Sequence, residues 1–141
     1  MPTENRTKSY LIARIVCAKL FIDSHYLDDI DVLRVAREAC FSKFHFLRLF
    51  KKTYRITPHQ YLTMLRIEKA KQMLGASVSA TETCFYLGFD SMSSFIRLFK
   101  RHVNTTPAAY AGEVSCLRNK ILAQPLDQVP LCFIEYLHWD K

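Results

Sequence analysis

The feature that most constrains the fold of this chain is an internal repeat. The heptapeptide FLRLFKK at residues 46–52 returns as FIRLFKR at residues 95–101. The match extends without gaps from 42–62 to 91–111 at an offset of 49, and upstream AREACF matches CFYLGF at an offset of 48. A unit of roughly thirty residues in only two copies predicts two paired modules, because a solenoid needs more repeats.

The first copy predicts two short helices joined by a turn. Apolar residues at helical spacing indicate a helix over 30–39, for which Asp31 is the N-cap. Ser42 then caps a second helix over 42–55, and the pair Thr57-Pro58 stops it. Two helices joined in this way form a helix-turn-helix unit, although generic helical hairpins share the same description.

The second copy predicts the same unit. Ser79 caps a helix over 80–87, which Gly88 ends, and Ser91 caps a helix over 91–104. Between the copies, a proline in the first turn and a closing glycine predict one continuous linker helix about 25 Å long. We expect five segments: an N-terminal tail (1–8), a first helix-turn-helix subdomain (9–57), the linker helix (58–76), a second helix-turn-helix subdomain (77–112) and a C-terminal tail (113–141).

Composition predicts an all-α protein. The chain of 141 residues has 50% apolar residues but only three glycines, and no stretch alternates with a period of two. The longest early apolar stretch is interrupted by Arg14 and Lys19, so we expect no membrane contact and a cytoplasmic, nucleoid-associated location. Five cysteines lack metal-site spacing, and no nucleophile elbow, phosphate loop or paired carboxylate is present. We expect no enzyme, cofactor or metal.

Positive charge is concentrated in the two copies of the repeat. Residues 42–59 contain five Lys or Arg and residues 91–107 contain three, neither with any acid, while the whole chain has a formal net charge of +7. A single charge run is commonly a solvated helix face. Two equivalent runs favour a polyanion as partner.

A helical projection separates the two faces of each second helix. In the first, Phe46, Leu49, Phe50 and Thr53 point inward, as do Phe95, Leu98, Phe99 and His102 in the second. The outward positions are Phe44, Arg48, Lys51 and Arg55 in the first copy, and Ser93, Arg97, Lys100 and Asn104 in the second. The repeated phenylalanines therefore belong to the core, whereas the repeated arginine is not needed for packing.

Several motifs of the chain resemble those of the AraC/XylS family of transcriptional regulators. In size the chain is similar to the stand-alone members of that family. The motifs are A-x-x-x-C-F-S-K-F-H-F-x-R-x-F-K-K (36–52), T-P-x-x-Y-L (57–62) leading into R-I-E-K-A-K-Q-M-L (66–74), and G-F-D-S-x-S-x-F-x-R-x-F-K-R (88–101) followed by T-P-x-x-Y (106–110). The resemblance covers about residues 8–112. It implies seven helices, beginning with one over 9–25, and two recognition helices in adjacent major grooves of duplex DNA.

The resemblance also implies which side chains meet DNA. The family's base-contact positions fall on Phe44, Leu47, Arg48, Met92, Ser93, Ile96 and Arg97. We expect phosphate contacts from the neighbouring cations Lys43, Lys51, Lys52, Arg55, Lys100 and Arg101. An arginine can bond guanine N7 and O6 together, whereas the apolar residues at four of these positions can contact only a thymine methyl.

The chain departs from the family pattern at Cys40, where a turn glycine is usual. The first turn therefore either avoids positive φ or carries slight strain. Larger family members carry an effector-binding domain before the DNA-binding part, but only about eight residues precede the first predicted helix. The protein is then regulated by its abundance or by a partner, or the chain is a fragment.

Two function classes follow. The first is a sequence-specific transcription regulator, an activator that contacts RNA polymerase and binds duplex DNA as a monomer. The alternative is a helical protein-interaction module that uses the outward apolar residues Phe44, Leu47, Met92 and Ile96. The apolar tail either folds back on the domain or contacts a second copy or polymerase. The target promoter, the inducing signal and the sign of regulation are not encoded in any motif.

Overall fold

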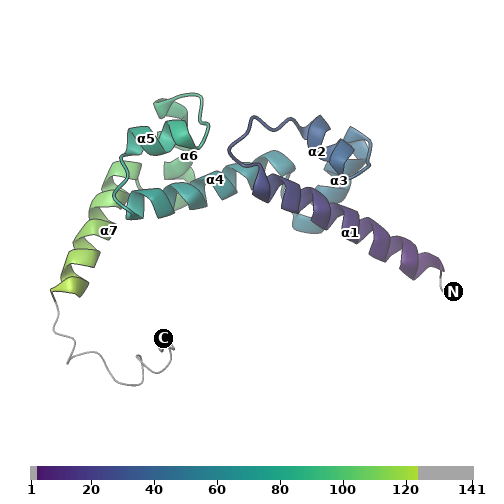
Figure 1. Cartoon of the computed structure of the whole chain (residues 1–141), viewed down its shortest axis with the longest axis horizontal. Coiled ribbons are helices and arrows are strands. Elements are labelled where there is room, and N and C mark those ends of the chain that lie inside the picture. Colours follow the sequence, from purple (N-terminus) through teal and green to yellow (C-terminus); the bar gives the residue numbers. More distant parts are fainter. Residues whose placement is uncertain (1–2, 124–141) are drawn as a thin grey trace, which may run out of the picture.

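The computed structural model describes residues 3–123, and this part of the chain contains seven α-helices and no strand. The all-α prediction is therefore confirmed. Figure 1 shows the helices in chain order: α1 (Thr3–Ser24), α2 (Val32–Glu38), α3 (Lys43–Tyr54), α4 (Pro58–Gly75), α5 (Ala80–Tyr86), α6 (Met92–Val103) and α7 (Pro107–Leu122).

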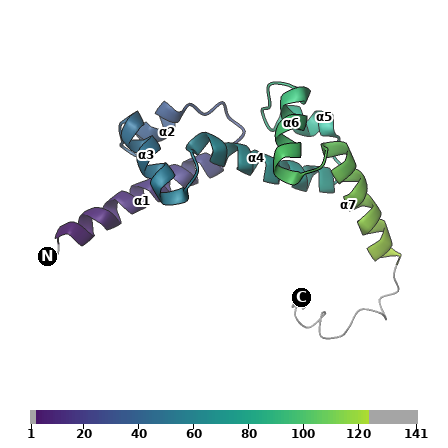
Figure 2. The ribbon, with the colours of Figure 1, turned by 180° about the vertical axis from the view of Figure 1, so that it is seen from behind.

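The long helix α4 links two helix-turn-helix units. In Figures 1 and 2 the pair α2–α3 and the pair α5–α6 lie on the same side of α4, toward its opposite ends. Helix α1 packs on the first pair and on α4, whereas α7 packs on α4 and α6. The two recognition helices, α3 and α6, are therefore carried by one continuous rod.

Each unit has its own hydrophobic core. The first core takes buried residues from α1, α2 and α3, including Ile15, Ala36 and Phe46. The second takes them from α4, α5 and α6, including Ile67 and Phe95. The inward phenylalanines of the repeat are completely buried in both units, as the helical projection predicted.

The duplication is longer in the structure than the repeat first identified. Residues 14–22 of α1 (RIVCAKLFI) match residues 66–74 of α4 (RIEKAKQML) at an offset of 52, sharing Arg, Ile, Ala and Lys. The matched isoleucines and alanines are buried in their respective cores. Each unit is therefore three helices, and α4 serves both as the end of the first unit and as the first helix of the second.

The two turns have the same unusual backbone. Cys40 has φ of 53° and Gly88 has φ of 71°, both in the left-handed region. The alternative in which the first turn avoids positive φ is thus wrong, because the short link between α2 and α3 requires this conformation whatever the side chain. Arg55 and Asn104, which follow the recognition helices, are likewise equivalent, with φ of 65° and 63°.

Helix caps follow the predictions with small differences. Ser79 and Ser91 accept bonds from the backbone of Glu82 and Ser94, whereas Asp31 and Ser42 occupy N-cap positions without a side-chain cap bond. Thr57 forms a reciprocal capping box with Gln60 at the start of α4. Each copy of the repeat thus has a Thr-Pro pair that ends the recognition helix and begins the next long helix.

Two expectations about helix ends differ from the structure. Helix α1 begins at Thr3, well before residue 9, because no proline or glycine interrupts the residues between them. Helix α7 continues past residue 112 to Leu122, so the first residues of the predicted tail are helical. The apolar segment whose docking was left open lies at 129–141, outside the described residues.

Two inward predictions are wrong. Thr53 and His102 are exposed, although the projection placed them with the buried phenylalanines. Both lie in the last turn of a recognition helix, where a side chain on the inner face extends past the helices that cover the core. Tyr54 and Val103, one residue further on, instead pack at the edges of the two cores.

Candidate nucleic-acid interface

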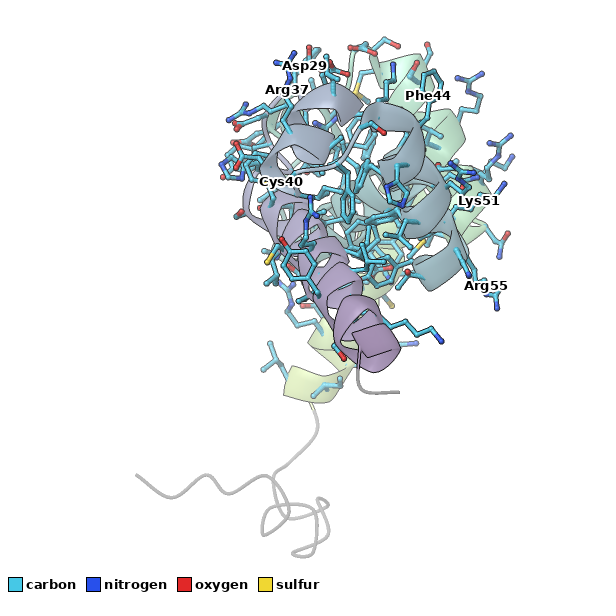
Figure 3. The ribbon with its side chains drawn as sticks, turned by 90° about the vertical axis from the view of Figure 1, so that its right-hand side faces the viewer. Asp29, Arg37, Cys40, Phe44, Lys51 and Arg55 are labelled. Atoms are coloured by element: carbon cyan, nitrogen blue, oxygen red, sulfur yellow. The ribbon has the colours of Figure 1, made fainter. Side chains whose placement is uncertain are left out.

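Helix α3 presents a largely cationic face to solvent. Phe44 is 80% exposed, and Arg48, Lys51 and Arg55 are also exposed. Figure 3 shows Phe44, Lys51 and Arg55 projecting on one side of the first unit, with Arg37 and Cys40 on the opposite side. The apolar ring at the N-terminal end and the cations along the helix form one surface, because they share a face of α3.

Helix α6 presents the equivalent face. Ser93, Arg97 and Lys100 are exposed, and Ile96 is 38% exposed. Arg97 and Lys100 stand at the same positions of α6 as Arg48 and Lys51 in α3. The structure therefore places the outward residues of both copies in solvent, as predicted.

Two candidate base contacts are less accessible. Leu47 and Met92 are half-buried, and Met92 packs against the second core. Met92 is the first residue of α6, directly after the cap Ser91, so its side chain also closes the end of the core. Only part of each of these side chains is available to a partner.

The charge on this surface is not neutralised by ion pairs within the described residues. Eight cations of α3 and α6 and their caps are exposed, namely Lys43, Arg48, Lys51, Lys52, Arg55, Arg97, Lys100 and Arg101. Within residues 3–123 none of them forms an ion pair, whereas Lys19 pairs with Asp23 and Lys71 with Glu68 elsewhere. These two ion pairs lie outside the recognition helices.

A cavity lies between α4 and the α5–α6 pair. Its volume is about 210 Å³, and its lining includes His59 and Arg66 of α4, Asp90 of the turn, and Arg97 of α6. The guanidinium of Arg66 is half-buried, and burial lowers its pKa below the ordinary value. The cavity places Arg97 beside the linker helix.

Sequence reasoning missed two arginines. Arg14 Nε donates to the carbonyl of Ala39 at 2.7 Å, and Arg66 Nη1 donates to that of Gly88 at 3.1 Å. Each arginine therefore holds the turn of one helix-turn-helix unit. The shared R-I-x-x-A-K pattern of α1 and α4 is the signal that could have identified them, but its offset differs from that of the longer repeat.

The described residues contain no cluster of three His, Cys, Asp or Glu that could hold a metal ion. In the same part of the chain, no helix is both long and apolar enough to cross a membrane. The exposed cysteines Cys17, Cys40 and Cys116 are free thiols, whereas Cys84 is buried in the second core, which raises its pKa.

Two helix-turn-helix units on one rigid helix, each with a cationic recognition helix, define a double helix-turn-helix protein. A family model described as a helix-turn-helix domain matches residues 35–113. The chain belongs to the AraC/XylS family of helix-turn-helix transcriptional regulators.

Three relatives illustrate the family. An uncharacterized HTH-type regulator of Pseudoalteromonas carrageenovora is 32% identical over 66% of this chain and 55% of its own length. The probable transcription factor PqrA of Proteus vulgaris is 33% identical over 59% of this chain and 69% of its own. The transcriptional activator RhaS of Escherichia coli O157:H7 is 31% identical over 62% of this chain. The chain spans about a third of the length of RhaS (32%).

A solved structure shares the fold. The DNA-binding domain of AdpA, a global transcriptional factor solved in complex with a target DNA, superposes with a TM-score of 0.70 at 26% identity. The alignment covers 74% of this chain and 96% of the AdpA domain. Both helix-turn-helix units are thus part of the shared architecture.

Proposed function

We propose that this protein is a sequence-specific DNA-binding transcription regulator that inserts α3 and α6 into successive major grooves on one face of the duplex. The observation that carries the proposal is the equivalent pair Arg48 and Arg97. Both are exposed, form no ion pair within residues 3–123, and lie on recognition helices that α4 holds together. Successive major grooves are about 34 Å apart, which sets the spacing that the two helices must match.

The proposed readout divides between two kinds of contact. Arg48 and Arg97 each bond one guanine through N7 and O6, and Phe44 contacts a thymine methyl. Ser93 and the less accessible Leu47, Met92 and Ile96 complete the base-facing set. The remaining cations neutralise phosphates and fix the register without reading sequence: Lys43, Lys51, Lys52, Arg55, Lys100 and Arg101.

We propose further that one chain binds an asymmetric site as a monomer. A helix-turn-helix protein commonly obtains two recognition helices by dimerising, whereas the duplication supplies both in this chain. Activation through contact with RNA polymerase is proposed from the family, of which the activator RhaS is a relative. The nucleoid is then the place of action, and no enzymatic activity is required.

The alternative function, a protein-interaction module, has weaker support. It requires the outward apolar residues to form a continuous surface, but Leu47 and Met92 are half-buried and only Phe44 is strongly exposed. The cations between them would also have to be desolvated by an apolar partner, which costs free energy unless acids pair with them. The surface is therefore better suited to a polyanion.

Selection of binding sites from a random duplex pool tests the proposal. We expect a single motif with two guanine-containing half-sites in direct orientation, about ten base pairs apart. Affinity for that site should fall steeply with salt, with log affinity linear in log salt concentration, because the bound protein cations release counterions from phosphates. No enrichment, or enrichment of a palindrome bound by two chains, would contradict the proposed monomeric regulator.

A further inference from the structure

We infer that Arg66 is a positioning residue that couples the two helix-turn-helix units and so sets the spacing of the recognition helices. Its guanidinium makes three hydrogen bonds that the sequence does not suggest. Nε donates to the carbonyl of Tyr26 at 2.7 Å, Nη2 to that of Asp28 at 2.9 Å, and Nη1 to that of Gly88 at 3.1 Å. The first two carbonyls belong to the first unit and the third belongs to the second.

Apart from the shared helix α4, the two units are joined by few contacts, because their cores are separate. Buried residues of the first core come from α1, α2 and α3, and those of the second from α4, α5 and α6. Figures 1 and 2 place the α1–α2 connection on the side of the first unit nearest the second. Residues 26–28 of this connection are the ones that Arg66 holds.

Other contacts at the same place support the assignment. Tyr26 packs against the second core, and Lys69 Nζ lies 5.7 Å from the centre of its ring. A Cβ at Gly88 would lie 3.3 Å from the carbonyl oxygen of Leu27 and 3.5 Å from Arg66 Nη2. The turn of the second unit therefore comes close to the α1–α2 connection around this guanidinium.

The pKa of Arg66 lies below its ordinary value, because the effect of burial exceeds that of the neighbouring acids. Burial lowers the pKa of Arg66, while Asp29 of the first unit and Asp90 of the second both raise it. Acids from the two sides thus flank one cation. A planar fork with several donors can satisfy three carbonyls at once, which an ammonium cannot do with the same geometry.

The matching residue Arg14 provides an internal comparison. It also holds the turn of a helix-turn-helix unit, through Ala39, and its guanidinium lies 4.1 Å from the ring centre of Phe41. All these partners belong to the first unit. The duplicated arginine thus has a local role in both units, and in the second it also reaches back to the preceding unit.

The consequence for DNA rests on the proposed function. If the two recognition helices are held at a fixed separation before binding, the second half-site is engaged at high effective concentration, and only at one spacing. Loss of the coupling should then weaken binding to the full site and broaden the tolerated spacing, while binding to one half-site stays unchanged. A residue needed only for folding would not alter the spacing preference.

A distance measurement in the free protein decides the inference without DNA. Spin labels would be placed at Arg37→Cys on α2 and Glu82→Cys on α5, both exposed. The background carries Cys17→Ser, Cys40→Gly, Cys116→Ser and Cys132→Ser, and keeps the buried Cys84. We expect a narrow distance distribution in the parent, a broader one in Arg66→Ala and Arg66→Lys, and no broadening in the matched control Arg14→Ala. Circular dichroism establishes that each variant is folded.

The second arm uses unlabelled protein and the selected site. Arg66→Lys, which keeps the charge and the aliphatic stem, should lose about tenfold in affinity on the full site. Inserting two base pairs between the half-sites should penalise it less than wild type. Distributions that stay as narrow as the parent's in the folded Arg66 variants, or that broaden equally in Arg14→Ala, overturn the inference. Failure of every protein to bind DNA would instead overturn the proposed function and leave the distances to decide the coupling.

Discussion

Cys40 and Gly88 occupy equivalent positions in the two turns and share a left-handed backbone, with φ of 53° and 71°. A side chain in this region costs free energy that glycine avoids, so Cys40→Gly should stabilise the first unit by about 0.5–1 kcal/mol, net of glycine's greater entropy in the unfolded chain. Gly88→Ala should destabilise the second unit by more than 1 kcal/mol, on the order of the cost of strain, because its Cβ also meets Leu27 O. Urea unfolding measures both changes. If both variants were stabilised, or both destabilised, to the same extent, the prediction would be contradicted.

How far the sequence predicts this molecule depends on whether a feature is local. The recognition helices, the serine caps at Ser79 and Ser91 and the buried phenylalanines depend on residues close in sequence, and these predictions are confirmed. Thr53 and His102 were misplaced because periodicity does not say where the covering helices end. The three carbonyls around Arg66 lie 22 to 40 residues away in the chain, so no local pattern could predict them.

Arg48→Ala and Arg97→Ala should each weaken binding to the selected site by about 1 to 3 kcal/mol, because each removes a bidentate contact with one guanine. Binding to random duplex should change much less, since phosphate contacts remain. Titration of both duplexes at one salt concentration gives the comparison. Arg37→Ala is the matched control, because Arg37 lies on the opposite side of the first unit (Figure 3). An equal loss on both duplexes would remove these arginines from base readout.

Lys51→Ala and Lys100→Ala should weaken specific and random binding alike. Each lysine is exposed and forms no ion pair within residues 3–123. Without it, one phosphate of the bound DNA keeps its counterion when the protein binds. The slope of log affinity against log salt should become shallower by about one unit for each substitution. Lys120→Ala on α7, an exposed lysine outside the recognition helices, should leave the slope unchanged. An unchanged slope in the first two variants would refute their phosphate contacts.

Thr83→Val should stabilise the protein. The hydroxyl of Thr83 is fully buried in the second unit and has no hydrogen-bond partner among the described residues. Replacing it by a methyl group of similar size removes the desolvation cost of an unsatisfied polar atom, a gain of about 1 kcal/mol. The exposed Thr81 on the same helix is the control, and Thr81→Val should change stability by less than about 0.5 kcal/mol. Thermal or urea unfolding measures both variants. A lower stability of Thr83→Val would indicate that the Thr83 hydroxyl does have a hydrogen-bond partner.

Tyr61 ties α4 to α1, because its hydroxyl donates to Oδ1 of Asp23 at 2.5 Å. Burial, and secondarily this bond, raise the pKa of Tyr61 above the ordinary value of 10.0, so the folded state favours the neutral phenol. The resulting stability is fully present below about pH 10 and is lost as pH rises from there through the folded pKa.

Tyr61→Phe should therefore lower the free energy of unfolding at pH 8 by about 1.5 to 3 kcal/mol, the range for a hydrogen bond to a charged acceptor. The difference between wild type and variant should shrink above pH 10, because the phenylalanine has no proton to lose. Urea unfolding at pH 8 and pH 10.5 measures both values. Tyr54→Phe is the control for burial alone. Burial raises the pKa of Tyr54 as well, so the stability difference between wild type and this variant should also shrink above pH 10. A pH-independent difference would show that Tyr61 contributes through packing alone.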